Sequence, residues 1–514
     1  MAKAEIASYF SREIDKPRDH CAVVGMISFT DKDVAPAVRI ALHDQQNRGE
    51  DGSGIATRSD YSGFFTLFKD LGLVAHAFPD GKLEEKKLFG SLGIGHNRYA
   101  TSGVREKDID EKRKCLQPYH VGFGGRSLVL AHNGNIPEKY LQKLRDELPP
   151  DVPLESDSDS EVLAWRILFA KGDTWREKII NGLDGVVGAY SLVIGTDDGD
   201  LFGIKDPRGI RPLVVARMEE GAALVSESRG LEHIDGVLDR KEVGNGQLVH
   251  IAKKGDISIE QIFPKVDTAR CVIESIYLKH PYSYEGERKV REIRMLMGVG
   301  LSREVIVPED WVIVGIPASG DEIAEGYARA LGRRTDNLIK KDRYRTNRTF
   351  IGDSDGDRTN KLEMKFTIDD DVKGKKLVLI DDSVIRGKTT KKLIAALRVR
   401  GAVEIHVLSG SPPFINICDL GVDIATLQEL IALKKNGGED FVVRSNEEIA
   451  AEIGADSIHY LSLDGLIEAI GGERNEFCTN CLTREHPIEQ IGMDIDIVYS
   501  TKSRIAPIKL VSAT

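Results

Sequence analysis

The strongest chemical signal in the sequence is a short polar segment that follows an apolar run. The run KLVLI, residues 376–380, ends at two adjacent carboxylates, Asp381 and Asp382. A loop with several hydroxyl groups comes next, and a helix-like segment spans residues 389–398. The residues after the carboxylates that are suited to contact a ligand are Ser383, Arg386, Gly387, Thr389 and Thr390.

These residue types and their spacing predict a site for a phosphorylated sugar. Open α/β sheets bind ligands at the carboxyl ends of their strands, where the two carboxylates lie. The first turn of the following helix offers N–H groups to a phosphate, and Gly387 lets the backbone approach closely. Adjacent carboxylates suit hydroxyl groups or a divalent cation rather than a phosphate. We therefore expect a ligand with a phosphate, a diol and Mg²⁺.

The segment DDSVIRGKTT, residues 381–390, resembles the loop that binds phosphoribosylpyrophosphate (PRPP) in type I phosphoribosyltransferases. Its sequence is similar to that of the corresponding loop in the glutamine PRPP amidotransferase family (amidophosphoribosyltransferases). Residues 312–328, VIVGIPASGDEIAEGYA, resemble the pyrophosphate loop of the same family, which usually has Asp in place of Ala318. The resemblance implies that residues 381–390 bind PRPP and that Ser319 and the two carboxylates hold Mg²⁺.

A basic segment before this loop, NLIKKDRYRTNRTF at 337–350, resembles the flexible loop that closes over PRPP in the family. The resemblance places Lys341, Tyr344 and Arg348 against PRPP. Cationic groups there would neutralise the leaving pyrophosphate, and closure would exclude water from a reactive sugar cation. The whole stretch 335–371 is polar, and we expect it to be a long functional loop.

Cys21 and three later segments resemble the class II glutamine amidotransferase domain. A Cys that opens a strand such as CAVVGM is, by itself, most often an inert buried residue. The later segments change that interpretation because they occur in the order of the family: HNRYATSG (96–103), LAHNGNI (130–136) and SDSE (158–161). Three further segments also resemble the family: NRGEDGSGI (47–55), DPRGIRPL (206–213) and SES (226–228). In the first of them, Asn47 and Glu50 differ from the usual residues of the family.

The resemblance implies a role for five residues. The thiolate of Cys21 attacks the carboxamide of glutamine, and its own α-amine, with an ordinary pKa of about 7.7–8.0, acts as the base. Asn133 and the N–H of Gly134, expected in a tight turn, stabilise the oxyanion. Arg98 forms a bidentate pair with the α-carboxylate of glutamine, and Asp159 binds its α-ammonium group.

The role of the α-amine requires that Cys21 be the first residue of the working enzyme. Cys21 is internal in the encoded chain, so its nitrogen is an amide and cannot act as a base. We therefore expect residues 1–20 to be a propeptide that is removed before the enzyme works. The alternative is that residues 1–20 are an ordinary N-terminal arm and that the glutaminase is inactive.

Four of the six cysteines suggest a metal centre. Cys478 and Cys481 form a C-x-x-C motif, and a four-thiolate site would need Cys271 and Cys418 as partners. Zinc and a [4Fe–4S] cluster both fit four thiolates, and the spacing does not choose between them. The three surrounding segments resemble those of the iron–sulfur branch of the family: 270–283, 411–418 and 478–483. The resemblance implies a structural or oxygen-sensing [4Fe–4S] cluster; buried thiols without metal are the alternative.

Composition excludes several classes of protein. The 514-residue chain has 41% hydrophobic and 30% charged residues, as in an ordinary folded soluble protein. Its net charge of −11 and its lack of basic blocks argue against nucleic-acid binding. No run approaches the ~18 to 20 apolar residues of a membrane span, so we expect no membrane attachment. Residues 1–20 lack the apolar core of a secretory signal, and we expect a cytoplasmic protein.

The secondary structure that the sequence predicts around these residues differs between the two halves of the chain. The first half predicts short strands and helices, such as a strand at 22–29, a helix at 34–46 and a turn-rich break at 47–54. The second half alternates apolar strands with helices, which is typical of a parallel α/β sheet. With the resemblance, this predicts an α/β protein with two domains. We expect an N-terminal Ntn-hydrolase αββα sandwich over 21–262 and a type I phosphoribosyltransferase domain, with a C-terminal cluster-binding region, over 263–514.

The resemblance also implies the reaction. Glutamine is hydrolysed at Cys21, the ammonia passes through the interior, and it displaces pyrophosphate from C1 of PRPP. The products are glutamate, pyrophosphate and 5-phosphoribosylamine, in the first step of purine synthesis. A homo-oligomer, dimer or tetramer, and inhibition by purine nucleotides are implied too. Two alternatives stay open: a catalytically reduced paralogue that senses PRPP or nucleotides, which Ala318 favours, and an amidotransferase with another phosphosugar acceptor.

Overall fold

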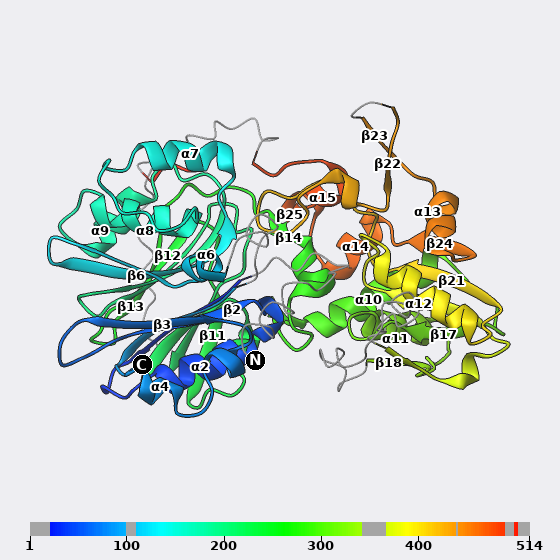
Figure 1. Ribbon diagram of the computed structural model, residues 1–514, viewed down its shortest axis with the longest axis horizontal. Coiled ribbons are helices and arrows are strands. Elements are labelled where there is room, and N and C mark those ends of the chain that lie inside the picture. Colours follow the sequence, from blue (N-terminus) through cyan, green and yellow to red (C-terminus); the bar gives the residue numbers. More distant parts are fainter. Residues whose placement is uncertain (1–20, 99–108, 342–365, 438–439, 489–497, 502–514) are drawn as a thin grey trace, which may run out of the picture.

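The structure is a computed structural model that describes residues 21–98, 109–341, 366–437, 440–488 and 498–501. Figure 1 shows two lobes side by side, one built from two large sheets and the other from a smaller sheet with its helices. Within the described ranges, no helix is long and apolar enough to cross a membrane.

Two antiparallel sheets form the first lobe. One has seven strands in the order β11-β9-β10-β1-β4-β2-β3, and the other has six in the order β13-β12-β8-β7-β6-β5. The strands of the first are β1 (Ala22–Ser28), β2 (Gly52–Arg58), β3 (Phe65–Leu71), β4 (Leu92–Arg98), β9 (Val214–Met218), β10 (Gly221–Val225) and β11 (Val237–Glu242). Those of the second are β5 (Tyr119–Phe123), β6 (Arg126–Asn135), β7 (Ala189–Thr196), β8 (Leu201–Lys205), β12 (Gln247–Ile251) and β13 (Ile257–Gln261).

The alternation of side chains along β1 explains why these sheets stack between helices. Val23 and Ile27 face the apolar cluster between the two sheets, whereas Val24 and Met26 face the cluster under α2. Gly25 permits the close stacking, because a Cβ there would lie 2.5 Å from Val193. The helices that cover the sheets are α2 (Ala35–Asp44), α3 (Val74–Ala77), α4 (Lys82–Glu85), α6 (Ile109–Lys114), α7 (Glu138–Asp146), α8 (Asp159–Phe169) and α9 (Trp175–Gly182). The expected αββα sandwich is confirmed.

A four-stranded parallel sheet, β17-β20-β21-β24, forms the centre of the second lobe. Three of its strands are largely buried on both faces, as is typical of parallel sheets, whereas the edge strand at residues 457–460 is only partly buried. The four strands are β17 (Val312–Gly315), β20 (Lys376–Asp381), β21 (Glu404–Ser409) and β24 (Ser457–Tyr460). The helices are α10 (Val290–Glu304), α11 (Gly320–Ala330), α12 (Lys388–Val399), α13 (Asn446–Ile453), α14 (Leu463–Ile470) and α15 (Asn480–Thr483). The expected parallel sheet is confirmed.

The second lobe also contains several two-stranded sheets. They are β14 (Arg270–Cys271) with β25 (Phe477–Cys478), β15 (Tyr284–Glu285) with β16 (Arg288–Lys289), β18 (Ile339–Lys341) with β19 (Phe366–Ile368), and β22 (Leu433–Lys435) with β23 (Phe441–Val443). The β18–β19 pair corrects the expectation that all of 335–371 is loop. Backbone pairing to a partner distant in sequence gives both polar segments a strand structure that their composition does not reveal.

Two further local expectations are wrong. The break expected at 47–54 already enters β2 at Gly52, and the turn expected around Asn133 is the end of the ten-residue strand β6. In both cases the polar and glycine-rich sequence indicates a turn, but hydrogen bonding to neighbouring strands keeps the backbone extended. Tertiary pairing overrides local propensity at these sites.

One apolar cluster joins the lobes. It includes Leu130 of β6 and Ile210 from the first lobe and Met297 of α10 from the second, and each of these side chains is at most 2% exposed. The chain also returns to the first lobe near its end, where the Tyr499 hydroxyl donates to the carbonyl of Gly188 (3.3 Å). The two lobes are therefore packed together rather than tethered by a linker.

Close backbone contact between α10 and α11 generates a stability prediction. A Cβ at Gly298 would lie 2.0 Å from the carbonyl oxygen of Ile323, whereas one at Gly300 would first meet a methyl group of Leu461 at 3.0 Å. We expect Gly298→Ala to destabilise the protein by about 1–3 kcal/mol through overpacking. Gly300→Ala, the matched control on the same helix, should be neutral or stabilising because Ala favours the helix. Equal denaturant midpoints for the two variants would contradict this packing.

Candidate active sites and the four-cysteine group

The pairing of β1 with its neighbours positions Cys21. The N–H of Val23 donates to the Ser226 hydroxyl (2.9 Å), and the Cys21 carbonyl accepts a hydrogen bond from Nε of the buried Arg48 (3.2 Å). Ala22 pairs with Asn97 of β4, so Arg98 lies across from Cys21. The register of one strand pair thus brings the expected nucleophile next to the expected carboxylate-binding arginine.

Asn133 and Gly134 lie at the end of β6, on the second sheet. The Nδ2 group of Asn133 is buried and has no hydrogen-bond partner among the described residues. Gly134 has a φ of +151°, and a Cβ there would lie 2.0 Å from the carbonyl oxygen of Ala189, so only glycine fits. A buried amide donor without a partner is costly unless a ligand accepts its hydrogen bond. This pair therefore has the properties of an oxyanion-binding site.

Asp159 begins α8, where the Ser158 hydroxyl caps the helix. Its carboxylate accepts hydrogen bonds from the N–H of Ile136 (3.0 Å) and the Ser160 hydroxyl (3.0 Å), and Nδ1 of His132 lies 3.6 Å away. Burial would raise the pKa of Asp159, but His132 and these hydrogen bonds lower it to about 2. The group is an anion at neutral pH and suits an ammonium ligand.

His132 connects the separate parts of this site. Its carbonyl lies 3.2 Å from Nε2 of His96 on β4, and its side chain approaches Asp159. It also directly precedes Asn133. Hence the first sheet, the oxyanion pair and the helix that carries Asp159 meet around one histidine. Arg98 contributes on the same side, where its Nη1 donates to the carbonyl of Cys115 (2.6 Å).

The second candidate site is at the carboxyl end of β20. The N–H of Asp382 donates to Oδ1 of Asp381 (2.9 Å), and the Ser383 hydroxyl donates to Oδ1 of Asp382 (2.6 Å). All three residues are buried. Gly387 turns the chain into α12 with a φ of +71°, so Thr389 and Thr390 lie in the first turn of that helix. The arrangement of carboxylates beside a helix N-terminus is the one expected for a phosphorylated diol.

The expected pyrophosphate loop packs against the same strand end. The N–H of Ile316 donates to the carbonyl of Ile380 (2.9 Å), and a Cβ on Gly320 would lie 3.1 Å from Cα of Asp381. Ser319, which precedes Gly320, therefore belongs to the loop that packs against this strand end. Oxygen donors of this kind suit Mg²⁺, which typically keeps several waters and uses one or two carboxylates together with substrate phosphates. The residues present fit such an ion.

The remaining expected PRPP contacts, Arg386, Lys341, Tyr344 and Arg348, lie outside the turn that begins α12. Arg386 donates from Nε to Glu429 (2.6 Å) and from Nη2 to the carbonyl of Asp423 (3.0 Å), so much of its hydrogen-bonding capacity holds the loop that contains Glu429. Lys341 is exposed at the end of β18. Tyr344 and Arg348 lie outside the described residues.

The four cysteines expected to bind a metal come together between the lobes. Cys271 pairs with Cys478 across the parallel β14–β25 ladder, and the carbonyl of Cys481 accepts hydrogen bonds from the N–H groups of Ile415 (2.8 Å) and Asn416 (3.2 Å), close to Cys418. Burial raises the pKa of the Cys271 thiol to about 11. Among the described residues, no three His, Cys, Asp or Glu side chains are close enough to hold a single metal ion.

Comparison with known proteins places this geometry in a family. A glutamine amidotransferase domain profile matches residues 105–233, and a phosphoribosyl transferase domain profile matches residues 300–410. The amidophosphoribosyltransferase of Synechocystis sp. is 34% identical over 480 residues, which are 92% of either chain. That of Methanothermobacter thermautotrophicus is 35% identical over 478 residues, covering 91% of this chain and 95% of that protein.

A solved structure agrees over the same length. Glutamine PRPP amidotransferase from B. subtilis, complexed with ADP and GMP, superposes with a TM-score of 0.79 at 32% identity and covers 93% of this chain and 100% of that chain. This chain belongs to the amidophosphoribosyltransferase family. The expected enzyme class and the order of the two domain types are thereby confirmed.

Within the family fold, sequence reasoning missed two residues that organise the glutamine site. His132 contacts Asp159, and Arg48 holds the carbonyl of Cys21. Each lies inside a segment that resembles the family, next to residues that were singled out. Only the folded structure reveals the roles of these two residues, because each contacts a group that is distant in the sequence.

The lowered pKa of Asp159 predicts a pH-dependent contribution to stability. A carboxyl group whose pKa is lower in the folded state stabilises the protein above its unfolded pKa, and it loses that contribution as the pH falls. For Asp159 the loss should occur between about pH 4 and about pH 2 and amount to about 2 kcal/mol. The difference in unfolding free energy between wild type and Asp159→Asn should shrink over this window.

Acid unfolding monitored by circular dichroism would measure this difference. Asp151→Asn, at an exposed position, is the matched control for removal of a charge. A difference between wild type and Asp159→Asn that stays constant from pH 4 to pH 2 would contradict the assignment.

Proposed function

We propose that the protein is a glutamine-dependent amidophosphoribosyltransferase that makes 5-phosphoribosylamine, glutamate and pyrophosphate from PRPP, glutamine and water. The observation that supports this function is the presence of two candidate half-sites in one chain. One gathers Cys21, Arg98 and the oxyanion pair, and the other gathers the carboxylates and the phosphate-binding turn that follow β20. Relatives that share more than nine-tenths of the chain bear the same enzyme name.

In the first half-reaction, the thiolate of Cys21 adds to the carboxamide carbon of glutamine. Asn133 Nδ2 and the N–H of Gly134 donate to the developing oxyanion, which replaces the partner that the buried amide lacks. Arg98 pairs with the α-carboxylate, and Asp159, an anion at neutral pH, pairs with the α-ammonium group. Collapse of the adduct releases ammonia, and water then releases glutamate from the thioester.

In the second half-reaction, ammonia displaces pyrophosphate from C1 of PRPP. Asp381 and Asp382 bind the ribose hydroxyls, and Ser383, Gly387, Thr389 and Thr390 bind the 5-phosphate at the start of α12. Arg386 positions the loop through Glu429. When bound at Ser319, Asp381 and Asp382, Mg²⁺ would neutralise charge on the leaving group. We assign the same role to Lys341, Tyr344 and Arg348, from the segment 337–350 that resembles the closing loop of the family.

A sensor of PRPP or nucleotides is the second candidate, because Ala318 replaces the usual Asp in the pyrophosphate loop. Glutamate release and pyrophosphate release distinguish the candidates. In the enzyme, PRPP and Mg²⁺ should stimulate glutamate formation, with pyrophosphate formed in equal amount. Binding of PRPP without turnover would support the sensor and contradict the enzyme.

Replacement of the nucleophile should separate the half-reactions. We expect Cys21→Ala to abolish glutamine-dependent synthesis, because no thiolate is left to attack, while synthesis from free ammonia remains. The assay is pyrophosphate release with glutamine or with ammonium chloride as nitrogen donor. Cys115→Ala is the matched control, since the hydrogen bond that Cys115 accepts from Arg98 goes to its backbone carbonyl and not to its thiol. Loss of both activities in Cys21→Ala would contradict the division of labour.

We propose that residues 1–20 are a propeptide whose removal frees the α-amine of Cys21 to act as the base. The intact mass of active protein should therefore correspond to a chain that starts at Cys21. Blocked removal should leave ammonia-dependent synthesis and abolish the glutaminase. An active glutaminase that still carries Met1 would refute this proposal.

We also propose that Cys271, Cys418, Cys478 and Cys481 hold a [4Fe–4S] cluster, as in the iron–sulfur branch of the family. Three buried thiols and the half-buried thiol of Cys418, all with raised pKa values, are unfavourable as thiolates unless a cationic core compensates them. When bound, the cluster would crosslink β14, β25 and the segment before Cys418.

Elemental analysis of anaerobically purified protein tests the cluster. We expect about four iron atoms and four sulfides per chain, together with a brown colour. Cys478→Ser should lose the iron, whereas Cys115→Ser should keep it. Stoichiometric zinc without iron would contradict the cluster. We further propose domain limits of 21–262 and 263–514, a cytoplasmic homo-oligomer, and inhibition by purine nucleotides at the PRPP loop.

A further inference from the structure

The buried carboxylate of Glu227 is shared between the two lobes. Its side chain is fully buried, just after β10 of the first lobe. One carboxylate oxygen, Oε1, accepts a hydrogen bond from Nδ2 of Asn47 (2.8 Å), also in the first lobe. The other, Oε2, accepts from the N–H of His280 and from the hydroxyl of Ser283 (2.9 Å each), in the segment that leads into α10. The carboxylate therefore fastens the segment 278–283 to the first lobe.

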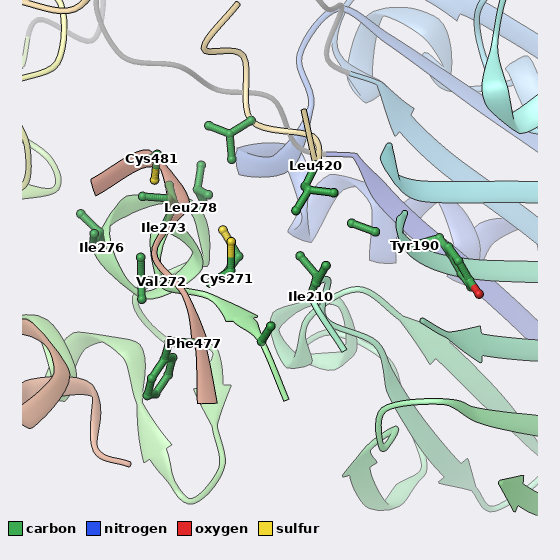
Figure 2. Close-up of a cluster of buried hydrophobic side chains, with 14 of the residues drawn as sticks. Tyr190, Ile210, Cys271, Val272, Ile273, Ile276, Leu278, Leu420, Phe477 and Cys481 are labelled. Atoms are coloured by element: carbon green, nitrogen blue, oxygen red, sulfur yellow. The ribbon is translucent and has the colours of Figure 1, made fainter. Parts of the chain in front are cut away.

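Asn47 forms a second connection between the same parts of the chain. Its Nδ2 donates to the carbonyl of Leu278 (2.9 Å) as well as to Glu227, so both hydrogens of the amide are used. Figure 2 shows Leu278 with Ile273 and Ile276 in the buried cluster at the boundary of the lobes. Asn47 thus holds the backbone at the point where the segment 278–283 leaves that cluster.

The residues next to this pair hold the strand that begins after Cys21. The hydroxyl of Ser226 accepts a hydrogen bond from the N–H of Val23 (2.9 Å), and the N–H of Ser226 donates to the carbonyl of Val23 (3.1 Å). Arg48, which follows Asn47, donates from Nε to the carbonyl of Cys21 (3.2 Å). The connection to the second lobe and the support of Cys21 are therefore built from adjacent residues.

The cations around Glu227 have other carboxylate partners. The guanidinium of Arg48 donates to both oxygens of Glu274 (2.9 Å each), whereas its Nη1 lies 4.0 Å from Oε2 of Glu227. Lys279, which also interacts with the charge of Glu227, pairs with Glu285 (3.3 Å). Removal of the charge of Glu227 therefore leaves each of these two cations with a carboxylate partner.

The fastened segment is joined to the second candidate site through two helices. The N–H groups of Val290 and Arg291, in the first turn of α10, donate to the carbonyls of Ser283 (2.9 Å) and Pro281 (2.8 Å). Close backbone contact joins α10 to α11, and α11 begins at Gly320 in the expected pyrophosphate loop. The packing is therefore continuous from that loop to the carboxylate of the first lobe.

We propose that Glu227 and Asn47 are positioning residues for Cys21 and that they make its position depend on the second lobe. The proposal rests on the proposed function, because it concerns the stimulation of glutamate release by PRPP. When PRPP fixes the pyrophosphate loop, α10 and the segment 278–283 are held in one place. The carboxylate of Glu227 transmits that placement to the hydrogen bonds that hold Cys21.

The experiment measures glutamate release, with and without PRPP and Mg²⁺, and ammonia-dependent synthesis in the purified enzyme. Asn47→Asp removes both donors and places a second carboxylate beside Glu227. We expect it to lower PRPP-stimulated kcat/KM for glutamine about 10- to 100-fold through misplacement of Cys21. Glutamate release without PRPP should fall less, and ammonia-dependent synthesis should remain.

The double variant Asn47→Asp/Glu227→Gln exchanges the amide and the carboxylate. It should restore part of the stimulation by PRPP, because an amide again donates to a carboxylate between the two positions. Absence of any such recovery overturns the pairing role of Glu227. Full stimulation in Asn47→Asp, or equal loss of glutamine-dependent and ammonia-dependent synthesis, overturns the proposal while the proposed function stands.

Asn245→Asp is the matched control. The amide of Asn245 also donates to two acceptors, the carbonyls of Pro207 (2.9 Å) and Val266 (3.0 Å), neither of which belongs to the segments that hold Cys21. This variant should keep the stimulation by PRPP, and an equal loss there would overturn the specific role of Asn47. A wild type that makes pyrophosphate from glutamine and PRPP but releases glutamate equally without PRPP overturns the dependence on the second lobe alone. A wild type that forms neither product overturns it together with the proposed function.

Discussion

One buried apolar cluster runs through both lobes, and the relation between the two half-sites depends on it. It includes Leu130 from the sheet that carries Asn133, and Ile380 from the strand that ends at Asp381. Because this packing is continuous, neither site can move far without disturbing the other. An apolar interior also suits the passage of neutral ammonia, since it offers few groups that would bind or protonate it.

Buried charged groups also connect segments that are far apart in the sequence. Arg48 donates to both carboxylate oxygens of Glu274 (2.9 Å each), and Nη1 of Arg211 lies 3.5 Å from the same carboxylate. Buried charges of this kind are costly unless each has its partner. This ion-pair chain therefore helps to fix Arg48, whose Nε donates to the carbonyl of Cys21.

Sequence reasoning predicted the local structure well where a unit is formed by one contiguous segment. The strand–carboxylate–helix unit at 376–390 and the αββα and parallel-sheet architecture follow from apolar periodicity and resemblance. It failed where partners are remote: β18 and β19 pair across more than twenty intervening residues, and Asn133 is extended because β7 holds it. Arg48, Glu274 and His132 were missed for the same reason. Their roles depend on contacts with groups that only the fold brings near.

We propose that ammonia released at Cys21 reaches PRPP without leaving the protein. The test uses glutamine labelled with ¹⁵N in its amide, supplied with PRPP and unlabelled ammonium. Free ammonia also reacts with PRPP and gives some unlabelled product, but mass spectrometry of the trapped phosphoribosylamine should show a ¹⁵N fraction well above that of the ammonia pool. A ¹⁵N fraction equal to that of the pool would show that the ammonia escapes into solvent before it reacts.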